Sequence, residues 1–289
     1  MKSIRGLDVL VSGAASGIGR QVACDLARQG VASLRLLDVD QEGLASLAEE
    51  LRDSSRSNTS AEARVATLTT HRIDISNVED LGAFAANLGD APLDVLVHCA
   101  GVLCVGSFEQ LPMADVERII TINLLGTVRL TRALLPRLLR SERGCIVNVA
   151  SIAGLVSAPA LSAYAASKFG LVGFSQALET ELRGRIDVCT VCPGLVRTNI
   201  VRHARFGSHA GLDQPDERNT IDAALERLGI SAEQASRAII RAIERRPGLV
   251  LVGPDAHLLY HAHRLFPRLF RLGLYAAHRW LLRRGVLSA

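Results

Sequence analysis

Tyr164 and Lys168 stand four residues apart near the end of a segment that begins at Ser151, S-I-A-G-L-V-S-A-P-A-L-S-A-Y-A-A-S-K. On a helix this spacing is just over one turn, so the two side chains share a face. A phenol titrates near pH ~10, and a neighbouring ammonium favours the phenolate and lowers its pKa. The pair therefore predicts a tyrosine that exchanges protons near neutral pH, although the same spacing also occurs by chance on many helices.

Two further polar residues are candidates for the same site. Ser151 closes an apolar run, G-C-I-V-N-V-A-S, that predicts a buried strand. Because open parallel sheets bind ligands at the carboxyl ends of their strands, we expect the Ser151 hydroxyl close to Tyr164. Asn123 stands among isoleucines and leucines in a long helical pattern that runs from Pro112 to Arg140. A buried amide needs a hydrogen-bond partner, so Asn123 should have one.

A glycine-rich turn, S-G-A-A-S-G-I-G at residues 12–19, joins the first predicted strand to the first helix. Such glycines let the backbone approach a pyrophosphate, whose charge a helix N-terminus favours. The next strand ends in Asp38, about 20 residues further on, where a carboxylate can accept hydrogen bonds from ribose hydroxyls. Because that carboxylate would repel a 2′-phosphate and neither Ser16 nor Val39 is basic, we expect NAD rather than NADP. The alternative is an ordinary glycine turn and an ordinary strand-end aspartate.

Strand and helix patterns alternate along most of the chain, which predicts a doubly wound parallel α/β sheet with helices on both faces. The alternation is lost between residues 195 and 229, a polar and glycine-containing segment after a strand end. We expect this irregular segment to cover a substrate. Ile200, Val201 and Phe206 near its start indicate a fairly apolar pocket. One domain, residues 1–253, is expected to include this loop.

Residues 254–289 predict an amphipathic helical extension that restarts at Pro267, and no acidic residue follows Asp255. Two interpretations stay open: packing on the domain or a sister subunit, or peripheral attachment to anionic membrane. We expect no metal site, because no histidine pair at helical spacing comes with a nearby carboxylate. The basic stripe is His257, His261, Arg264, Arg268, Arg271 and His278, and the apolar stripe is Leu258, Ala262, Leu265, Leu269, Leu272 and Ala276.

The composition argues against several classes of protein. The chain has 289 residues, 48% of them apolar, which is enough for one sizeable core. A net charge of +4 with 4% aromatic residues argues against a nucleic-acid partner. Six cysteines lie mostly in strand-like runs, and even the Cys189-x-x-Cys192 pair does, so we expect buried thiols in a reducing compartment. With no secretory leader visible, we expect a cytoplasmic protein.

Taken in order, these motifs resemble those of the short-chain dehydrogenase/reductase family over roughly residues 6–253. The resemblance implies a single-domain Rossmann fold that binds a nicotinamide cofactor. It implies that Tyr164 is the general acid/base and that Lys168 lowers its pKa and holds the nicotinamide ribose. It further implies that Ser151 orients the substrate oxygen and that Asn123 supports a proton-relay water. The implied cofactor contacts are Gly13, Ser16, Gly17, Ile18, Gly19, Asp38, Asp74, Ile75, Ala100, Gly101, Asn123, Tyr164, Lys168, Pro193, Gly194, Val196 and Thr198.

The chain departs from the family pattern at three places. Ser12 replaces the usual threonine, and His98-Cys99 replaces two asparagines before Ala100-Gly101. The second change should remove an amide that helps to hold the strand. The tail after Gly253 lies outside the usual family core and is only weakly similar to the terminal helices of membrane-associated members that act on lipids.

The predicted function is reversible hydride transfer between NAD(H) and a secondary alcohol or ketone, with an apolar, lipid- or steroid-like substrate. One alternative is a dinucleotide-binding regulator or scaffold without turnover. Another is an isomerase or dehydratase that uses bound NAD. We expect the protein to form a homodimer or homotetramer.

Overall fold

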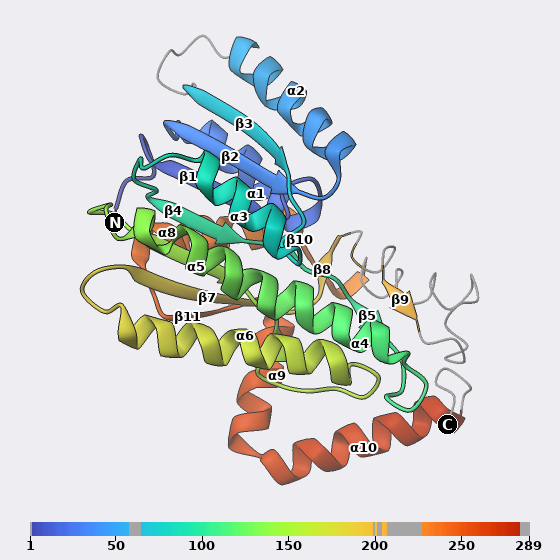
Figure 1. The fold of residues 1–289 in the computed structure, drawn as a ribbon. Helices are drawn as coiled ribbons and strands as arrows, with labels where there is room; N and C mark the ends of the chain where they lie inside the picture. The colour runs from blue at the N-terminus through green and yellow to red at the C-terminus, as the bar shows by residue number, and fades with distance from the viewer. Residues whose placement is uncertain (1, 58–64, 199, 201–203, 207–226, 284–289) are drawn as a thin grey trace.

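Seven parallel strands form the middle layer of the protein, in the order β11-β7-β6-β4-β1-β2-β3 (Figure 1). The computed structural model describes residues 2–57, 65–198, 200, 204–206 and 227–283. Side chains of the strands alternate between two cores: Val9 and Val11 of β1 enter one, and Leu10 enters the other. The strands are β1 (Asp8–Ser12), β2 (Ser33–Asp38), β3 (Thr67–Arg72), β4 (Val95–His98), β6 (Cys145–Val149), β7 (Asp187–Pro193) and β11 (Leu249–Val252).

Helices cover both faces of the sheet, which confirms the predicted doubly wound Rossmann architecture. The first core lies under α1 (Gly17–Arg28), α2 (Gln41–Ser57) and α8 (Ala232–Arg245). The second core lies under α3 (Val78–Asn87), α5 (Thr127–Leu138) and α6 (Ser162–Glu181). Each helix thus buries one apolar face on the sheet and leaves its polar face to solvent.

The helical pattern around Asn123 forms three consecutive elements. They are α4 (Met113–Ile120), the π-helical segment η2 (Thr121–Gly126) and α5. Together they are long and apolar enough to cross a membrane by length and composition alone. Leu130 and Leu134 are fully buried on the sheet, so this is a core helix of the domain. The sequence predicted one regular helix, whereas the structure places a π-helical turn at Asn123, a feature often found at functional sites.

The expectation of an irregular segment over residues 195–229 is wrong at the described ends of that segment. There, β8 (Val196–Arg197) pairs with β10 (Ile230–Ser231), and β9 (Arg205–Phe206) pairs with β5 (Cys104–Val105). Each pair is a separate two-stranded sheet, in which the backbone N–H and C=O groups of these residues find partners. Val201 and most of the predicted loop lie outside the described residues.

The extension folds into two helices, α9 (Pro254–Leu265) and α10 (Pro267–Arg283), so the predicted restart at Pro267 is confirmed. Ala256 of α9 is buried against the domain. The second helix packs mainly on α9 and lies apart from the sheet (Figure 1). Leu258 and Leu269 are 71% and 67% exposed, so packing of the apolar stripe on its own domain is wrong for these positions.

Candidate active site

Tyr164 and Lys168 lie in α6 and are both buried, with 9% and 5% of their surface exposed. The Lys168 Nζ lies 5.9 Å from the centre of the Tyr164 ring. It donates a hydrogen bond of 3.1 Å to the carbonyl oxygen of Val149, the last residue of β6. The helical spacing therefore brings the pair to the carboxyl end of a central strand, as the sequence predicted.

Ser151 begins the short 3₁₀ helix η3 (Ile152–Gly154), and its hydroxyl accepts a hydrogen bond of 3.1 Å from the Ala153 N–H. The glycine at position 154 lets η3 rest directly on α6, because a Cβ there would lie 2.6 Å from the Lys168 carbonyl oxygen. The Ser151 hydroxyl lies close enough to the Tyr164 phenol to lower its pKa. Ser151 and Tyr164 thus meet as expected.

Burial dominates the electrostatics of this group. It raises the pKa of the Tyr164 phenol, while the contact with Ser151 lowers the same pKa to a smaller extent. It also lowers the pKa of Lys168 to about 8. Burial raises the pKa of both Cys99 and Cys192, the thiols that act on Lys168, to about 12, so they stay neutral. The expected lowering of the Tyr164 pKa is therefore wrong for this arrangement, because the loss of hydration on burial outweighs the contact with Ser151.

Asn123 is fully buried and has the hydrogen-bond partners that its position predicted. Its Oδ1 accepts from the Val102 N–H at 2.8 Å, and its Nδ2 donates to the Val102 carbonyl at 2.9 Å. The same Nδ2 donates to Ser167 Oγ at 3.1 Å, and Ser167 Oγ donates to the Tyr164 carbonyl at 2.7 Å. The side chain therefore positions the segment after Gly101 and the start of α6. Support of a relay water by Asn123 stays a prediction.

Two glycines of the glycine-rich turn stand where no side chain fits. Gly13 has φ +71°, and a Cβ there would lie 2.4 Å from the Ala100 backbone nitrogen. At Gly19 a Cβ would lie 2.0 Å from the Gly13 carbonyl oxygen, so neither position accepts a side chain. Gly17, with φ +54°, faces the Thr198 side chain. These residues fit a dinucleotide cofactor, with the N-terminus of α1 at its phosphates.

Ser16 and Ile18, in the same turn, differ in their exposure to solvent. Ser16 is the exposed N-cap of α1, and its side chain makes no capping hydrogen bond. That leaves its hydroxyl available to a bound phosphate. Ile18 is partly buried against the first core and helps to fix the first turn of α1.

Asp38 ends β2 beside the glycine-rich turn, as predicted. Its Oδ2 accepts from the Ala15 N–H at 2.9 Å and its Oδ1 from the Asp40 N–H at 3.1 Å, so the carboxylate is held at the mouth of the turn. Arg72 of β3 is its neighbour in the parallel register and is exposed. Arg72 was not predicted from the sequence, because the register between two strands is not visible from one strand alone.

The remaining predicted contacts surround the same edge of the sheet. Asp74 accepts hydrogen bonds from the backbone and side chain of Ser76, at 2.8 and 2.6 Å. Ile75 packs on Gly126 of η2, where a Cβ would lie 2.8 Å from its side chain. Gly101 faces the Lys168 side chain, since a Cβ at this glycine would lie 3.5 Å from Lys168 Nζ. Pro193 ends β7, and Gly194, Val196 and Thr198 follow it.

His98 compensates for the amide that the family pattern has at this position. Its Nε2 forms a hydrogen bond of 2.9 Å with Thr131 Oγ1 of α5, and the ring is buried. Burial lowers the pKa of His98 to about 3, so the ring is neutral at physiological pH. The strand is thus held to α5 by an imidazole, and the expected loss of support at β4 is wrong.

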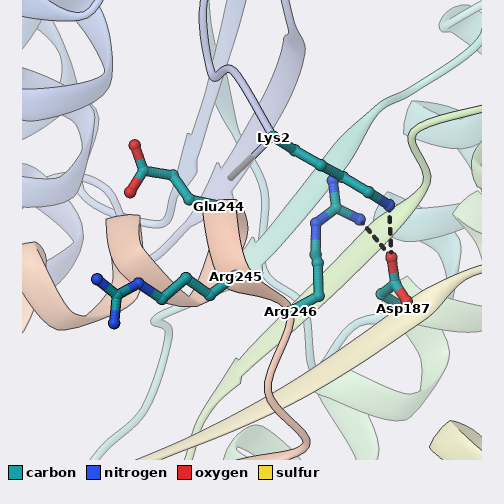
Figure 2. A pocket seen from close by; sticks show the side chains of 5 residues that line it. All are labelled: Lys2, Asp187, Glu244, Arg245 and Arg246. Carbon is teal, nitrogen blue, oxygen red and sulfur yellow. Dashed lines mark hydrogen bonds and ion pairs between the residues drawn. The ribbon is translucent and has the colours of Figure 1, made fainter.

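A pocket at the amino ends of the strands is lined by five residues that take no part in the candidate active site (Figure 2). Asp187 begins β7, and its Oδ2 accepts from Lys2 Nζ and from Arg246 Nη1, both at 3.0 Å. Glu244 and Arg245 complete the lining. In the described part of the chain, no group of three or more His, Cys, Asp or Glu side chains could hold a metal ion.

Comparison with known proteins agrees with this geometry. The family model described as short chain dehydrogenase matches residues 8–207. The putative oxidoreductase SadH of Mycobacterium tuberculosis is 32% identical over 264 residues, 89% of each chain. The probable oxidoreductase EphD of the same species is 33% identical over 91% of this chain, but the chain spans only 44% of EphD.

Solved structures show the same fold. A short-chain dehydrogenase/reductase from Burkholderia phymatum in complex with NAD is 26% identical, with a TM-score of 0.75 over 92% of this chain and 96% of that one. A short-chain dehydrogenase from Burkholderia cenocepacia in complex with NADP is 22% identical, with a TM-score of 0.73 over 94% and 99%, and shows the fold alone. With the family model covering most of the sheet, the chain belongs to the short-chain dehydrogenase/reductase family of NAD(P)-binding oxidoreductases.

Proposed function

We propose that the protein is an enzyme that transfers a hydride reversibly between NAD(H) and a secondary alcohol or ketone. One observation carries the proposal: the neighbouring hydroxyls of Ser151 and Tyr164 lie beside the buried ammonium of Lys168. A protein that only sensed or stored a dinucleotide would need neither hydroxyl. The intact group therefore favours turnover over a regulatory or scaffolding role.

Each side chain has a distinct role in this reaction. Ser151 orients the substrate oxygen, and Tyr164 accepts the proton of an alcohol or donates one to a ketone. The bound nicotinamide supplies the hydride acceptor or donor and, when oxidised, a positive charge. Lys168 stabilises the phenolate that forms as the proton moves, and it does so in a site where burial keeps water away.

We propose NAD as the preferred cofactor, because the Asp38 carboxylate is held beside the glycine-rich turn by two backbone N–H groups. Its carboxylate can accept hydrogen bonds from two ribose hydroxyls and would repel a phosphate at the 2′ position. Arg72 beside it is the group that could weaken this preference, since a guanidinium binds phosphate well.

We propose an apolar substrate, lipid- or steroid-like in character. The support is the cluster around the Tyr164 ring, where buried Cys104, Leu111 and Ala153 pack together with partly buried Val102 and Leu103. An apolar wall beside the proton-transferring hydroxyl favours a substrate with hydrocarbon next to its reacting carbon.

A screen of alcohols and ketones with NAD⁺ or NADH tests the proposal by following NADH absorbance. Net oxidation or reduction of the cofactor by any member of an apolar series is the expected result. Tight NADH binding with no turnover across the series would favour the regulator. Conversion of a substrate without net change in NADH would favour an isomerase or dehydratase.

We also propose a homodimer or homotetramer in the cytoplasm. Members of the family are commonly oligomeric, and all six cysteines are free thiols, as expected in a reducing compartment. Light scattering on the purified protein measures the oligomeric state directly.

The extension supports a proposal of peripheral contact with anionic membrane. Leu258, Leu265, Leu269 and Leu272 are each more than 60% exposed, far from the pattern of a packed helix. Six arginines and no acidic residue follow Asp255, so two copies of this surface would bring like charges together. Anionic lipid instead supplies the opposite charge and an apolar layer for the leucines.

Sedimentation with vesicles of phosphatidylcholine and phosphatidylserine tests this contact. Each basic residue near such a surface contributes about 1 kcal/mol, so Arg268→Ala/Arg271→Ala should weaken binding roughly 30-fold. Arg241→Ala on α8 is the matched control, because it removes an exposed charge elsewhere. If the full chain ignores these vesicles at low salt, and Leu269→Asp/Leu272→Asp splits the oligomer, the surface is a subunit interface instead.

A further inference from the structure

The first turn of α9 contacts the backbone that follows β7, although the two are far apart in the sequence. The Asp255 Oδ2 accepts a hydrogen bond of 2.7 Å from the Leu195 N–H. A Cβ at Gly194 would lie only 2.1 Å from the same oxygen, so the carboxylate fills the space that a side chain there would need. The extension therefore reaches the end of β7 through a single charged residue.

Leu195 is held from its other side as well. Its carbonyl oxygen accepts from the Ile230 N–H at 2.9 Å, and the Gly194 N–H donates to the Val252 carbonyl at 2.9 Å. The next two residues, Val196–Arg197, pair with Ile230–Ser231. The path of the chain from β7 to Val196 is thus fixed by contacts that all come from residues after position 229.

The second oxygen of Asp255 makes the contact more unusual. Oδ1 is buried, and in the described part of the chain it has no hydrogen-bond partner. It lies between two glycines, because a Cβ at Gly194 or at Gly253 would approach it within 2.3 and 2.6 Å. A buried carboxylate oxygen without a partner destabilises the fold, so its presence calls for a compensating role.

We infer that Asp255 is a positioning residue that sets the nicotinamide side of the cofactor site, where the family resemblance implies that Pro193, Gly194 and Thr198 make their contacts. It holds the Leu195 backbone, which fixes the course of Val196 and the approach of Thr198 to the glycine-rich turn. The inference rests on the proposed function, because it takes these residues as cofactor contacts. It assigns to the helical extension a part in cofactor geometry, separate from any contact that its exposed leucines make.

Two substitutions test this role in the full-length protein. Asp255→Leu removes the acceptor but keeps the branched shape of the side chain, whereas Asp255→Asn keeps an oxygen for the Leu195 N–H. A hydrogen bond to a charged group contributes enough that the Leu variant should bind NADH about 10- to 100-fold more weakly. The Asn variant should recover most of this affinity. Neither should change the affinity for ADP-ribose, which lacks the nicotinamide.

His257→Ala, an exposed change in the same helix, is the control and should leave both affinities unchanged. If the Leu variant does not fold, Asp255→Ala provides the same comparison. Equal losses of NADH and ADP-ribose affinity, or no loss of either, would overturn the inference. Failure of the wild-type protein to bind NADH would instead overturn the proposed function, so the two failures are distinguishable.

Discussion

Buried cations have different partners at the two ends of the parallel strands, called here the amino edge and the carboxyl edge of the sheet. At the amino edge, Arg246 is almost fully buried, yet it donates to the carboxylate of Asp187 and to three backbone carbonyls. At the carboxyl edge, Lys168 is equally buried, and its one hydrogen bond goes to the neutral Val149 carbonyl. Across the described residues no carboxylate lies within ion-pair distance of Lys168.

This difference separates stability from function. Removing a buried cation that satisfies a full set of acceptors leaves those acceptors without a partner and destabilises the fold. A buried cation without a counter-charge has its pKa lowered, as Lys168 does. Such a cation can interact strongly with a negative charge that forms during a reaction. The comparison predicts that changes at the carboxyl edge alter the chemistry, while changes at the amino edge alter the free energy of unfolding.

Tyr164→Phe should give the largest effect. It removes the proton donor and acceptor but keeps the ring in its apolar cluster. Proton transfer contributes ~10² to 10⁴-fold, so turnover should fall by that factor while NADH affinity stays nearly unchanged. Steady-state kinetics on an identified substrate and a fluorescence titration with NADH measure the two quantities. Near wild-type turnover in this variant would contradict the mechanism.

Asp38 should give the next largest effect, on the choice of cofactor. The wild-type protein should bind NADH more tightly than NADPH by ~2–4 kcal/mol, or roughly 30- to 1000-fold. Asp38→Ala should reduce that ratio, because it removes the repulsion and leaves Arg72, the neighbour of position 38 in the strand register. Parallel fluorescence titrations provide the measurement. Equal or tighter NADPH binding by the wild type would refute the preference, and Arg72→Ala would then show whether Arg72 causes it.

Arg246→Ala tests the amino edge. The substitution removes four donated hydrogen bonds and leaves Asp187 with Lys2 as its remaining partner. The free energy of unfolding should fall by ~2–4 kcal/mol, measured by denaturant titration. Below the unfolding transition kcat should match the wild type, because no group of the active site is touched. A change in kcat without a change in stability would reverse the assignment of the two edges.

The sequence predicted those features that depend on neighbouring residues. Local patterns were enough to place the main site residues at the carboxyl ends of the strands. Apolar runs and turn glycines indicated the positions of Gly13 and Asp38, and one-turn spacing indicated that Tyr164 and Lys168 share a helix face. The capping box at the start of α8 depends on a similarly local pattern, since Ser231 and Gln234 stand three residues apart.

Features that depend on distant residues were not predictable. The bond between His98 and Thr131 joins positions 33 apart, and that between Leu195 and Asp255 joins positions 60 apart. The raised pKa of Tyr164 was not predicted either. The sequence shows Lys168 one turn away, but the burial that raises the pKa depends on residues distant in the chain. Ser167, next to Lys168, could have been noticed as a partner for Asn123, since both lie in apolar patterns.

The smallest expected effect is the pH dependence of stability that Lys168 produces. Burial lowers its pKa from the usual 10.5 to about 8 in the folded protein. Between these two values the unfolded chain binds more protons at this site, so the free energy of unfolding should rise as pH increases from about 8 towards 10.5. Below pH 8 the full penalty of the buried ammonium is present.

Lys168→Met isolates this contribution, because the other titrating groups are common to both proteins. The difference in unfolding free energy, Met variant minus wild type, should be largest near pH 7 and shrink by ~1–3 kcal/mol by pH 10. Denaturant titrations at several pH values measure it. Arg246→Ala should give a difference from wild type that does not change over this range, since an arginine stays charged throughout. A Met-variant difference that is equally constant would mean that the Lys168 ammonium is hydrated or paired, and the contrast between the two edges would fail.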